Sequence, residues 1–288
     1  GCIAASRTRR SDCFTARITW GLLHGRVRFI ASSDPSGGPA KAGALLLLFR
    51  AGERPDGERL TSLVEAAERL TVTHQIPGEQ GQPAAGFELL RDGLTYDLLG
   101  LAPGRSHPEQ VDPFITRHRF GFRGDFDSSS LECMSLQPGP HLSAGMHSVA
   151  VVRTLASVAV TLAELLPGLI AVAWPPARSI VGVEFFRSSV SAWLAGGAFP
   201  SLGFTAFEDD LEGGIVSVGL SWFTGQEIRL ANNIAIDRAG AAKLGVRLVN
   251  HLVSQGKLVE NEFVVGPDGG RLALEPTRDG KVVRVRRA

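Results

Sequence analysis

The stretch from residue 215 to residue 230, IVSVGLSWFTGQEIRL, carries the clearest two-strand pattern in the chain. The apolar residues of its first half alternate with small ones and are Val216, Val218, Leu220 and Trp222. This period of two is typical of a strand that is buried on one face. Thr224-Gly225 then predicts a short turn, after which the alternation resumes at Ile228. We therefore predict a β-hairpin against which the other elements pack, with Trp222 buried in the core.

The rest of the chain contains both strand and helix patterns. Short apolar or alternating runs predict strands at 44–49, 72–76, 86–90, 94–99, 131–136, 169–174, 204–207, 263–265, 272–274 and 282–285. Apolar residues at helical spacing predict helices at 60–67, 146–166, 183–194 and 237–255. Such a mixture predicts an α+β fold. We expect a compact globular fold with a mixed, largely antiparallel sheet, covered by helices and containing ferredoxin-like elements.

Three local signals support particular elements. Ala44–Phe49 (ALLLLF) is a continuous apolar run, which predicts a central strand with both faces buried. Asp92-Gly93 separates two alternating runs and predicts a tight hairpin. Asp237 precedes a helical pattern and is placed to cap its first turn.

The domain organisation follows from a linker near the N-terminus. Residues 1–40 are basic, and SSDPSGGP separates them from the first core strand, so we interpret them as an edge hairpin or tail that adds little to the core. Residues 41–288 form a single α+β domain in this interpretation, with 41–136 and 137–288 as an alternative pair of halves. The region 101–130 is rich in Pro, Gly, Asp and Ser and predicts a long irregular excursion.

Charge and cysteine usage exclude several classes of function. The chain has 30 basic and 29 acidic side chains, and basic residues are in excess only at its two ends, so the body between them is acidic. An acidic body argues against nucleic-acid binding, which needs a clustered basic face. Cys2, Cys13 and Cys133 are scattered without zinc-ligand spacing. We expect free thiols in the cytoplasm and no cofactor or metal.

The most apolar helical segment, 146–166, raises the alternative of a membrane span. Arg153 and Glu164 lie on a narrow polar stripe of this segment, and Pro167-Gly168 follows it. Charged side chains within the hydrocarbon are costly, so we favour a core helix in a soluble protein that does not enter a membrane.

Motifs for common enzyme chemistries are missing from the sequence. It contains no GxGxxG, GxxxxGK[ST] or HExxH. Ser217 lies in mid-strand and out of step with a GxSxG nucleophile elbow. His141 and His147 are six residues apart, which does not place them on one helix face. The acids of the 208–212 segment are most simply a solvated turn.

A resemblance to a known family covers about residues 141–231. It rests on the run from His147 through Trp174, on Phe185…Trp193…Phe199-Pro200, and on Ser217-x-Gly219-Leu220-x-x-Phe223-x-x-x-Glu227-Ile228. These segments resemble the uncharacterised bacterial domain-of-unknown-function family 4261. Thr224 and Arg229 depart from that pattern, in which a Gly and an acid are expected. The resemblance implies an α+β fold of bacterial origin and no particular activity.

Glu227 is the candidate binding residue, because it opens the second strand of the predicted hairpin and the resemblance includes a Glu there. The structural alternative is that its carboxylate pairs with an arginine or caps backbone amides. Two functional hypotheses remain. The first is a non-catalytic module that binds another protein or a second copy of itself, through a sheet edge or the 101–130 excursion. The second is a hydrolase-like enzyme, in which Glu227, the 208–212 acids or a histidine converge only in three dimensions.

Overall fold

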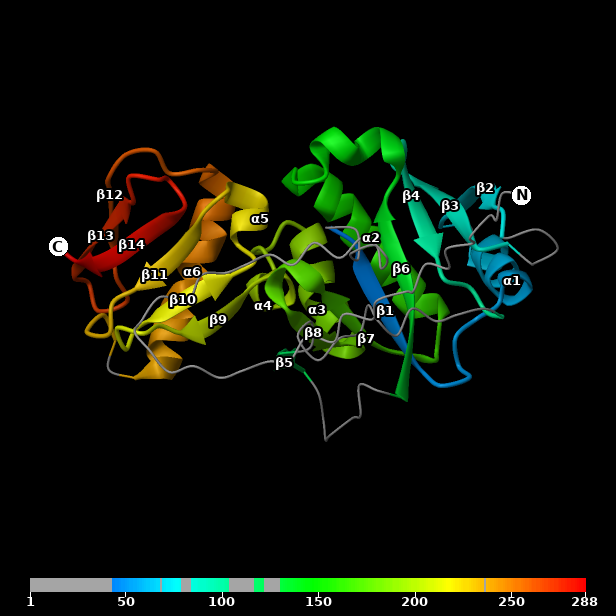
Figure 1. The fold of residues 1–288 in the computed structure, drawn as a ribbon, viewed down its shortest axis with the longest axis horizontal. Coiled ribbons are helices and arrows are strands. Elements are labelled where there is room, and N and C mark those ends of the chain that lie inside the picture. The colour runs from blue at the N-terminus through cyan, green and yellow to red at the C-terminus, as the bar shows by residue number, and fades with distance from the viewer. Residues whose placement is uncertain (1–42, 68, 79–83, 104–116, 122–129, 236) are drawn as a thin grey trace, which may run out of the picture. The chain divides into compact units, whose positions relative to one another are not determined.

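Two β-sheets and the helices packed on them make up the described part of the chain (Figure 1). The computed structural model describes residues 43–67, 69–78, 84–103, 117–121, 130–235 and 237–288, and residues 38–288 form one compact unit. Both sheets are mixed and largely antiparallel, so the predicted α+β fold is confirmed. The segment predicted as an N-terminal hairpin or tail, and most of the 101–130 excursion, lie outside the described residues.

The larger sheet has the strand order β2-β3-β4-β6-β1-β7-β8-β5. Its strands are β1 (Leu45–Arg50), β2 (Thr71–Ile76), β3 (Gly86–Arg91), β4 (Leu94–Leu99), β5 (His118–Phe120), β6 (Leu131–Pro138), β7 (Leu169–Trp174) and β8 (Ser179–Gly182). Neighbouring strands are antiparallel except for β5 and β8, which run parallel. The predicted hairpin turn forms between β3 and β4, where Asp92 and Gly93 both have positive φ.

Strand β1 lies between β6 and β7, and both of its faces are buried. Leu45, Leu47 and Phe49 belong to the main core, whereas Leu46 and Leu48 belong to a second apolar cluster on the opposite face. Residues of a strand alternate between faces, so a strand buried on both sides needs an uninterrupted apolar sequence. The central position predicted from ALLLLF is therefore confirmed.

Helices α1 (Gly57–Ala67), α2 (Val149–Leu165), α3 (Val183–Leu194) and α4 (Ser201–Phe204) contribute buried residues to the main core. Two short 3-10 helices lie at Pro140–Gly145 and Pro175–Ala177. Tyr96 anchors α2 by donating its hydroxyl to the Val151 carbonyl at 3.0 Å, and burial raises the pKa of Tyr96 to about 12. Among the described residues, no helix is both long and apolar enough to cross a membrane.

The polar side chains of α2 are used in contacts within the protein, as expected for a core helix. Ser148 caps its N-terminus by accepting a hydrogen bond from Ala150 N at 3.3 Å, so the helix begins slightly later than predicted. Arg153 donates to the Leu194 carbonyl at 2.7 Å, and its guanidinium lies 5.3 Å from the Trp193 ring centroid. These contacts join α2 to α3 along the polar stripe.

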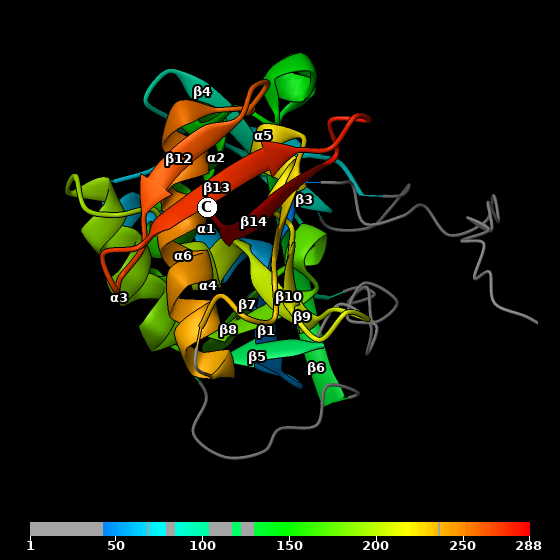
Figure 2. The same cartoon turned by 90° about the vertical axis from the view of Figure 1, so that its left-hand side faces the viewer.

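The smaller sheet has the strand order β12-β13-β14-β11-β10-β9. Its strands are β9 (Ala206–Asp209), β10 (Ile215–Val218), β11 (Glu227–Leu230), β12 (Glu262–Val265), β13 (Arg271–Pro276) and β14 (Val282–Arg287). Helix α6 (Arg238–Gln255) packs along one face of this sheet (Figure 2). Asp237 caps α6 as predicted, accepting a hydrogen bond from Gly240 N at 2.6 Å.

The predicted hairpin at 215–230 is wrong in its central part. Strands β10 and β11 do pair, but between them lies a short helix, α5 (Ser221–Thr224), which contains Trp222. Trp222 is half-buried, with its ring centroid 5.6 Å from that of Trp174. The buried residues of β10 are Ile215 and Ser217, so the buried face is opposite to the one predicted. The physical reason is a polar interaction of Ser217, described below.

The predicted strand at 204–207 also begins too early. Residues 201–204 form α4 instead, and β9 starts at Ala206. Phe204 is fully buried, and its ring lies 5.3 Å from that of Trp174 in an edge-to-face arrangement. An aromatic residue that closes a helix can be as buried as one in a strand, so its apolar character alone did not distinguish the two.

Candidate functional site

The Glu227 carboxylate holds together the segment that joins β10 to α5. One oxygen accepts hydrogen bonds from Gly219 N at 2.9 Å and Ser221 N at 3.0 Å. The other accepts from Ser217 Oγ at 2.5 Å and from Leu220 N at 3.2 Å. A carboxylate that receives several N–H and O–H donors forms charge-assisted hydrogen bonds, which are stronger than neutral ones. The carboxylate therefore caps the backbone amides at the start of α5.

The Ser217 hydroxyl accepts the hydrogen bond from Ile228 N that a backbone carbonyl of β10 would otherwise accept. Its Oγ accepts a hydrogen bond from Ile228 N at 2.9 Å while it donates to Glu227. Ladder pairing between β10 and β11 ends at Val216, so the hydroxyl satisfies an amide that would otherwise lack a partner. This is why a polar side chain occupies the buried face of β10.

Gly219 is needed at the tightest point of the same segment. Its φ is +93°, and a Cβ there would lie 2.8 Å from the Cβ of Ala177 and 3.0 Å from the Phe204 carbonyl oxygen. Only glycine has both the conformation and the space. Together with Ser217 and Glu227 it forms what we call the Glu227 lock. The geometry matches the structural alternative, in which the carboxylate caps amides, while a binding role for Glu227 stays a prediction.

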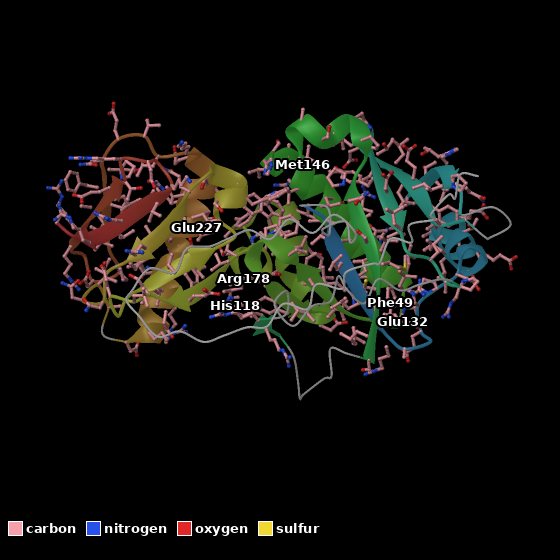
Figure 3. The ribbon with its side chains drawn as sticks, in the orientation of Figure 1. Phe49, His118, Glu132, Met146, Arg178 and Glu227 are labelled. Carbon is pink, nitrogen blue, oxygen red and sulfur yellow. The ribbon has the colours of Figure 1, made fainter. Side chains whose placement is uncertain are left out.

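The acids of the 208–212 segment lie on edge strand β9 of the smaller sheet and just after it, and they are paired with cations. Oε1 of Glu208 lies 3.0 Å from His118 Nε2, 3.0 Å from an Arg178 nitrogen and 3.2 Å from Arg117 Nε. His118 and Arg178, labelled in Figure 3, lie side by side because His118 N donates to the Arg178 carbonyl at 3.0 Å. Burial lowers the pKa of His118, and its hydrogen bond to Glu208 only partly opposes that effect.

The other acids of this segment also pair with arginines. Asp209 binds Arg238 at 2.6 Å, and Arg229 lies 3.3 Å from Asp210 and 3.7 Å from Glu212. The segment is therefore a set of ion pairs, not a merely solvated turn. Within the described part of the chain, no group of three or more His, Cys, Asp or Glu side chains could hold a metal ion.

Sequence reasoning missed the pairing of His118 with Glu208. The two residues are 90 positions apart and come from edge strands of the two sheets, β5 and β9. No local spacing can indicate such a contact. The His147 ring instead lies against the Trp222 ring in a tilted arrangement, with centroids 3.9 Å apart, and His141 Nδ1 lies 3.4 Å from Thr95 Oγ1. The structure thus does not bring His141 and His147 to a shared site with Glu227.

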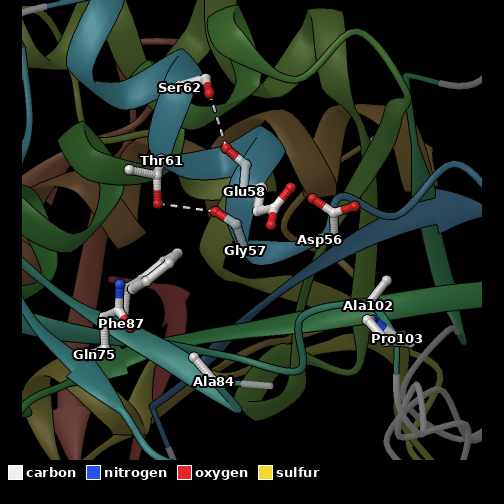
Figure 4. Close-up of a pocket in the computed structure, with 10 residues that line it drawn as sticks. All are labelled: Asp56, Gly57, Glu58, Thr61, Ser62, Gln75, Ala84, Phe87, Ala102 and Pro103. Carbon is white, nitrogen blue, oxygen red and sulfur yellow. Dashed lines mark hydrogen bonds between the residues drawn. The ribbon is translucent and has the colours of Figure 1, made fainter. Parts of the chain in front are cut away.

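A pocket of about 650 Å³ lies beside the start of α1, lined by Asp56, Thr61, Ser62 and Phe87 among others (Figure 4). Three of its polar side chains, those of Asp56, Thr61 and Ser62, are engaged with the helix itself. Thr61 donates to the Gly57 carbonyl, Ser62 donates to the Glu58 carbonyl, and Asp56 accepts from Arg59 N. These are helix-capping and back-bonding interactions. The carboxylate of Glu58 also lines the pocket, next to that of Asp56 (Figure 4).

Strand β12 presents a different kind of candidate site. It is an edge strand of the smaller sheet, and Phe263 and Val265 are 55% and 75% exposed on the same face of it. Val259, just before the strand, is 77% exposed. Native proteins usually protect an edge strand with charges, proline or a covering element. Alternation of apolar residues predicted a strand at 263–265, but nothing in its pattern indicated that this strand would lie at the edge of a sheet.

Comparisons with known proteins give no independent assignment. No protein-family model matches the sequence, and neither curated proteins nor solved structures include a match. The resemblance to domain-of-unknown-function family 4261 therefore stays a prediction.

Proposed function

We propose that this protein is a non-catalytic module that binds an extended segment of another protein along the edge of strand β12. The observation that carries the proposal is the pair of exposed apolar side chains on that edge, Phe263 and Val265. Addition of a strand to an exposed sheet edge is a recurring mode of peptide recognition. The Glu227 lock and the paired acids of the 208–212 segment serve as structural supports in this interpretation.

The hydrogen-bonding pattern of β12 supports strand addition. Gly266 N donates to the Gly270 carbonyl, which makes these residues a hydrogen-bonded pair in the antiparallel ladder with β13. Hydrogen-bonded and non-hydrogen-bonded pairs alternate along such a ladder. Phe263 and Val265 then occupy non-hydrogen-bonded positions, so their N–H and C=O groups point toward the open edge. A partner strand would satisfy both.

The side chains of β12 would add selectivity to this backbone pairing. Val264 faces the core, and Glu262 on the same face pairs with His251 of α6 at 3.0 Å. Phe263 and Val265 point the other way and would contact alternate side chains of an added strand. Burial of exposed apolar surface would stabilise the complex by roughly 25 cal/mol per Å² before the cost of ordering the partner is subtracted.

A proline substitution tests the proposal directly. Val265→Pro removes an edge-facing N–H without removing a hydrogen bond of the β12–β13 ladder, and proline is tolerated at strand edges. A random 12-residue peptide library would be selected against the wild-type protein, and the affinity of enriched peptides measured by fluorescence polarisation. We expect Val265→Pro to weaken binding about tenfold or more, as loss of a main-chain hydrogen bond and a clash with the added strand require.

The matched control is Val265→Thr, which keeps the N–H and changes only the side chain. It should retain most of the affinity if backbone pairing dominates. Circular dichroism would confirm that both variants are folded. The proposal fails if no peptide is enriched, or if enriched peptides bind Val265→Pro as tightly as wild type. It also fails if the wild type sediments as a dimer that Val265→Pro converts to a monomer, because β12 would then be occupied by a second copy.

A further inference from the structure

The face of the smaller sheet opposite α6 carries a group of arginines, which we call the arginine row: Arg229, Arg271, Arg284 and Arg286. Alternation along β14 places Val283 and Val285 in the core, so Arg284 and Arg286 point to the opposite face. The register aligns Arg284 with Arg229 on β11. On β13, Arg271 alternates with the buried Leu272 and is exposed on the same outer face.

Some arginines of the arginine row are paired with acidic side chains and others are not. Arg286 binds Glu275 at 2.9 Å, and Arg229 is paired with acids of the 208–212 segment. Arg284 forms no ion pair with a described residue; it lies beside Arg229 on β11 and opposite Glu275 on β13, whose carboxylate is bound by Arg286. Like charges opposite each other on neighbouring strands destabilise a sheet. The cation of this row that has no ion pair and no acid opposite it among the described residues is Arg271, so it is the one that an acidic partner would neutralise.

Arg271 brings this charge to the open edge. Its guanidinium carbon lies 4.5 Å from the centroid of the Phe263 ring, so the cation extends from β13 over β12. An added strand would lie about 4.8 Å beyond β12, with alternate side chains on the same face. A carboxylate at one of these positions could reach the guanidinium of Arg271. Arginine is suited to this role because its planar group can stack on an aromatic ring and bind a carboxylate at the same time.

We infer that the segment bound at β12 is acidic, with Asp or Glu alternating with apolar residues on the face that carries the arginine row. This inference rests on the proposed function, because it names the partner chemistry for the same edge. Charge complementarity favours this occupant. The apolar neighbours of the acids would contact Phe263 and Val265, and Arg271 would attract the acids. That attraction is screened beyond about 8–10 Å at physiological ionic strength.

Three matched peptides test the inference. Each is a 12-residue extended peptide in which the residues of one face alternate between valine and a polar residue, and that polar residue is all Glu, all Gln or all Lys. We expect the Glu peptide to bind the wild-type protein about tenfold more tightly than the Gln peptide, with the Lys peptide weakest, as one charge-assisted hydrogen bond allows. Raising the salt concentration should reduce the difference between the Glu and Gln peptides.

Arg271→Gln tests the preference for an acidic segment, and Val265→Pro tests strand addition itself. Arg271→Gln should remove most of the preference for Glu over Gln, whereas Arg247→Gln, which changes an exposed arginine on α6, should leave it unchanged. Val265→Pro should weaken all three peptides together. If the peptides bind in a Val265→Pro-sensitive manner but without preference for Glu, or if Arg271→Gln and Arg247→Gln behave alike, the acidic partner is wrong while strand addition stands. If Val265→Pro changes no affinity, strand addition itself is wrong.

Discussion

Substitution of Glu227 by glutamine separates a structural from a binding role for this residue. The amide of glutamine keeps one acceptor oxygen and replaces the other by an NH2 group, which cannot accept a hydrogen bond. The oxygen that accepts from Gly219 N and Ser221 N can be preserved, but then Leu220 N and the Ser217 hydroxyl lose their acceptor. Loss of hydrogen bonds to a charged group costs about 1.5–3 kcal/mol each.

Partial exposure of Glu227 allows water to replace part of this loss, so we expect Glu227→Gln to lower the free energy of unfolding by about 2–3 kcal/mol. Urea denaturation followed by tryptophan fluorescence would measure it. The control is Glu212→Gln, which removes an 80% exposed carboxylate whose ion pair with Arg229 is 3.7 Å long. It should cost less than about 0.5 kcal/mol. Equal stabilities of the two variants would refute the structural role and return Glu227 to the status of a binding candidate.

Two further variants test other parts of the structure. Gly245→Ala should lower the free energy of unfolding by about 1–2 kcal/mol, because the added Cβ would lie 2.6 Å from ring atoms of Phe207. This crowding outweighs the gain in helix propensity. Unchanged or higher stability in urea would contradict the prediction. His118→Gln should flatten the dependence of stability on pH below about 6.5. Because the folded pKa of His118 is lowered by burial, the unfolded chain takes up the proton first, and wild-type stability is lost as the pH falls. Urea midpoints of both proteins at pH 7.5 and 5.5 would show this, and parallel losses would be evidence against it.

Elements whose character is set by local pattern were predictable from the sequence. The helix at 183–194 and the hairpin at Asp92-Gly93 have the predicted bounds or turn, because apolar spacing and turn chemistry act over a few residues. The hairpin at 215–230 failed for the opposite reason. Alternation of apolar residues predicted that Val216 and Val218 of β10 would be buried, but they lie on its outward face. The apolar pattern cannot show that the Ser217 hydroxyl is buried because Glu227 and Ile228 satisfy its hydrogen bonds.

The candidate binding edge was predictable only in outline. Phe263–Val265 is recognisable as a strand, but whether a strand ends up in the middle or at the edge of a sheet depends on pairing across the whole chain. The parallel pairing of β11 with β14 joins segments more than fifty residues apart, and it places the arginines of β14 beside Arg229. No spacing rule within one strand contains that information.

The Glu227 lock also constrains how this chain can change over evolution. A glycine at 219 is required by its conformation and its neighbours, and a hydroxyl at 217 is useful only while an acid stands at 227. Loss of one partner leaves the other buried without its hydrogen bond, which is costlier than losing both together. Residues 217 and 227 should therefore vary as a pair among descendants of the same ancestor. Distant relatives that keep the acid would then also keep the hydroxyl and the glycine, in this order and spacing, even after the surrounding sequence has diverged.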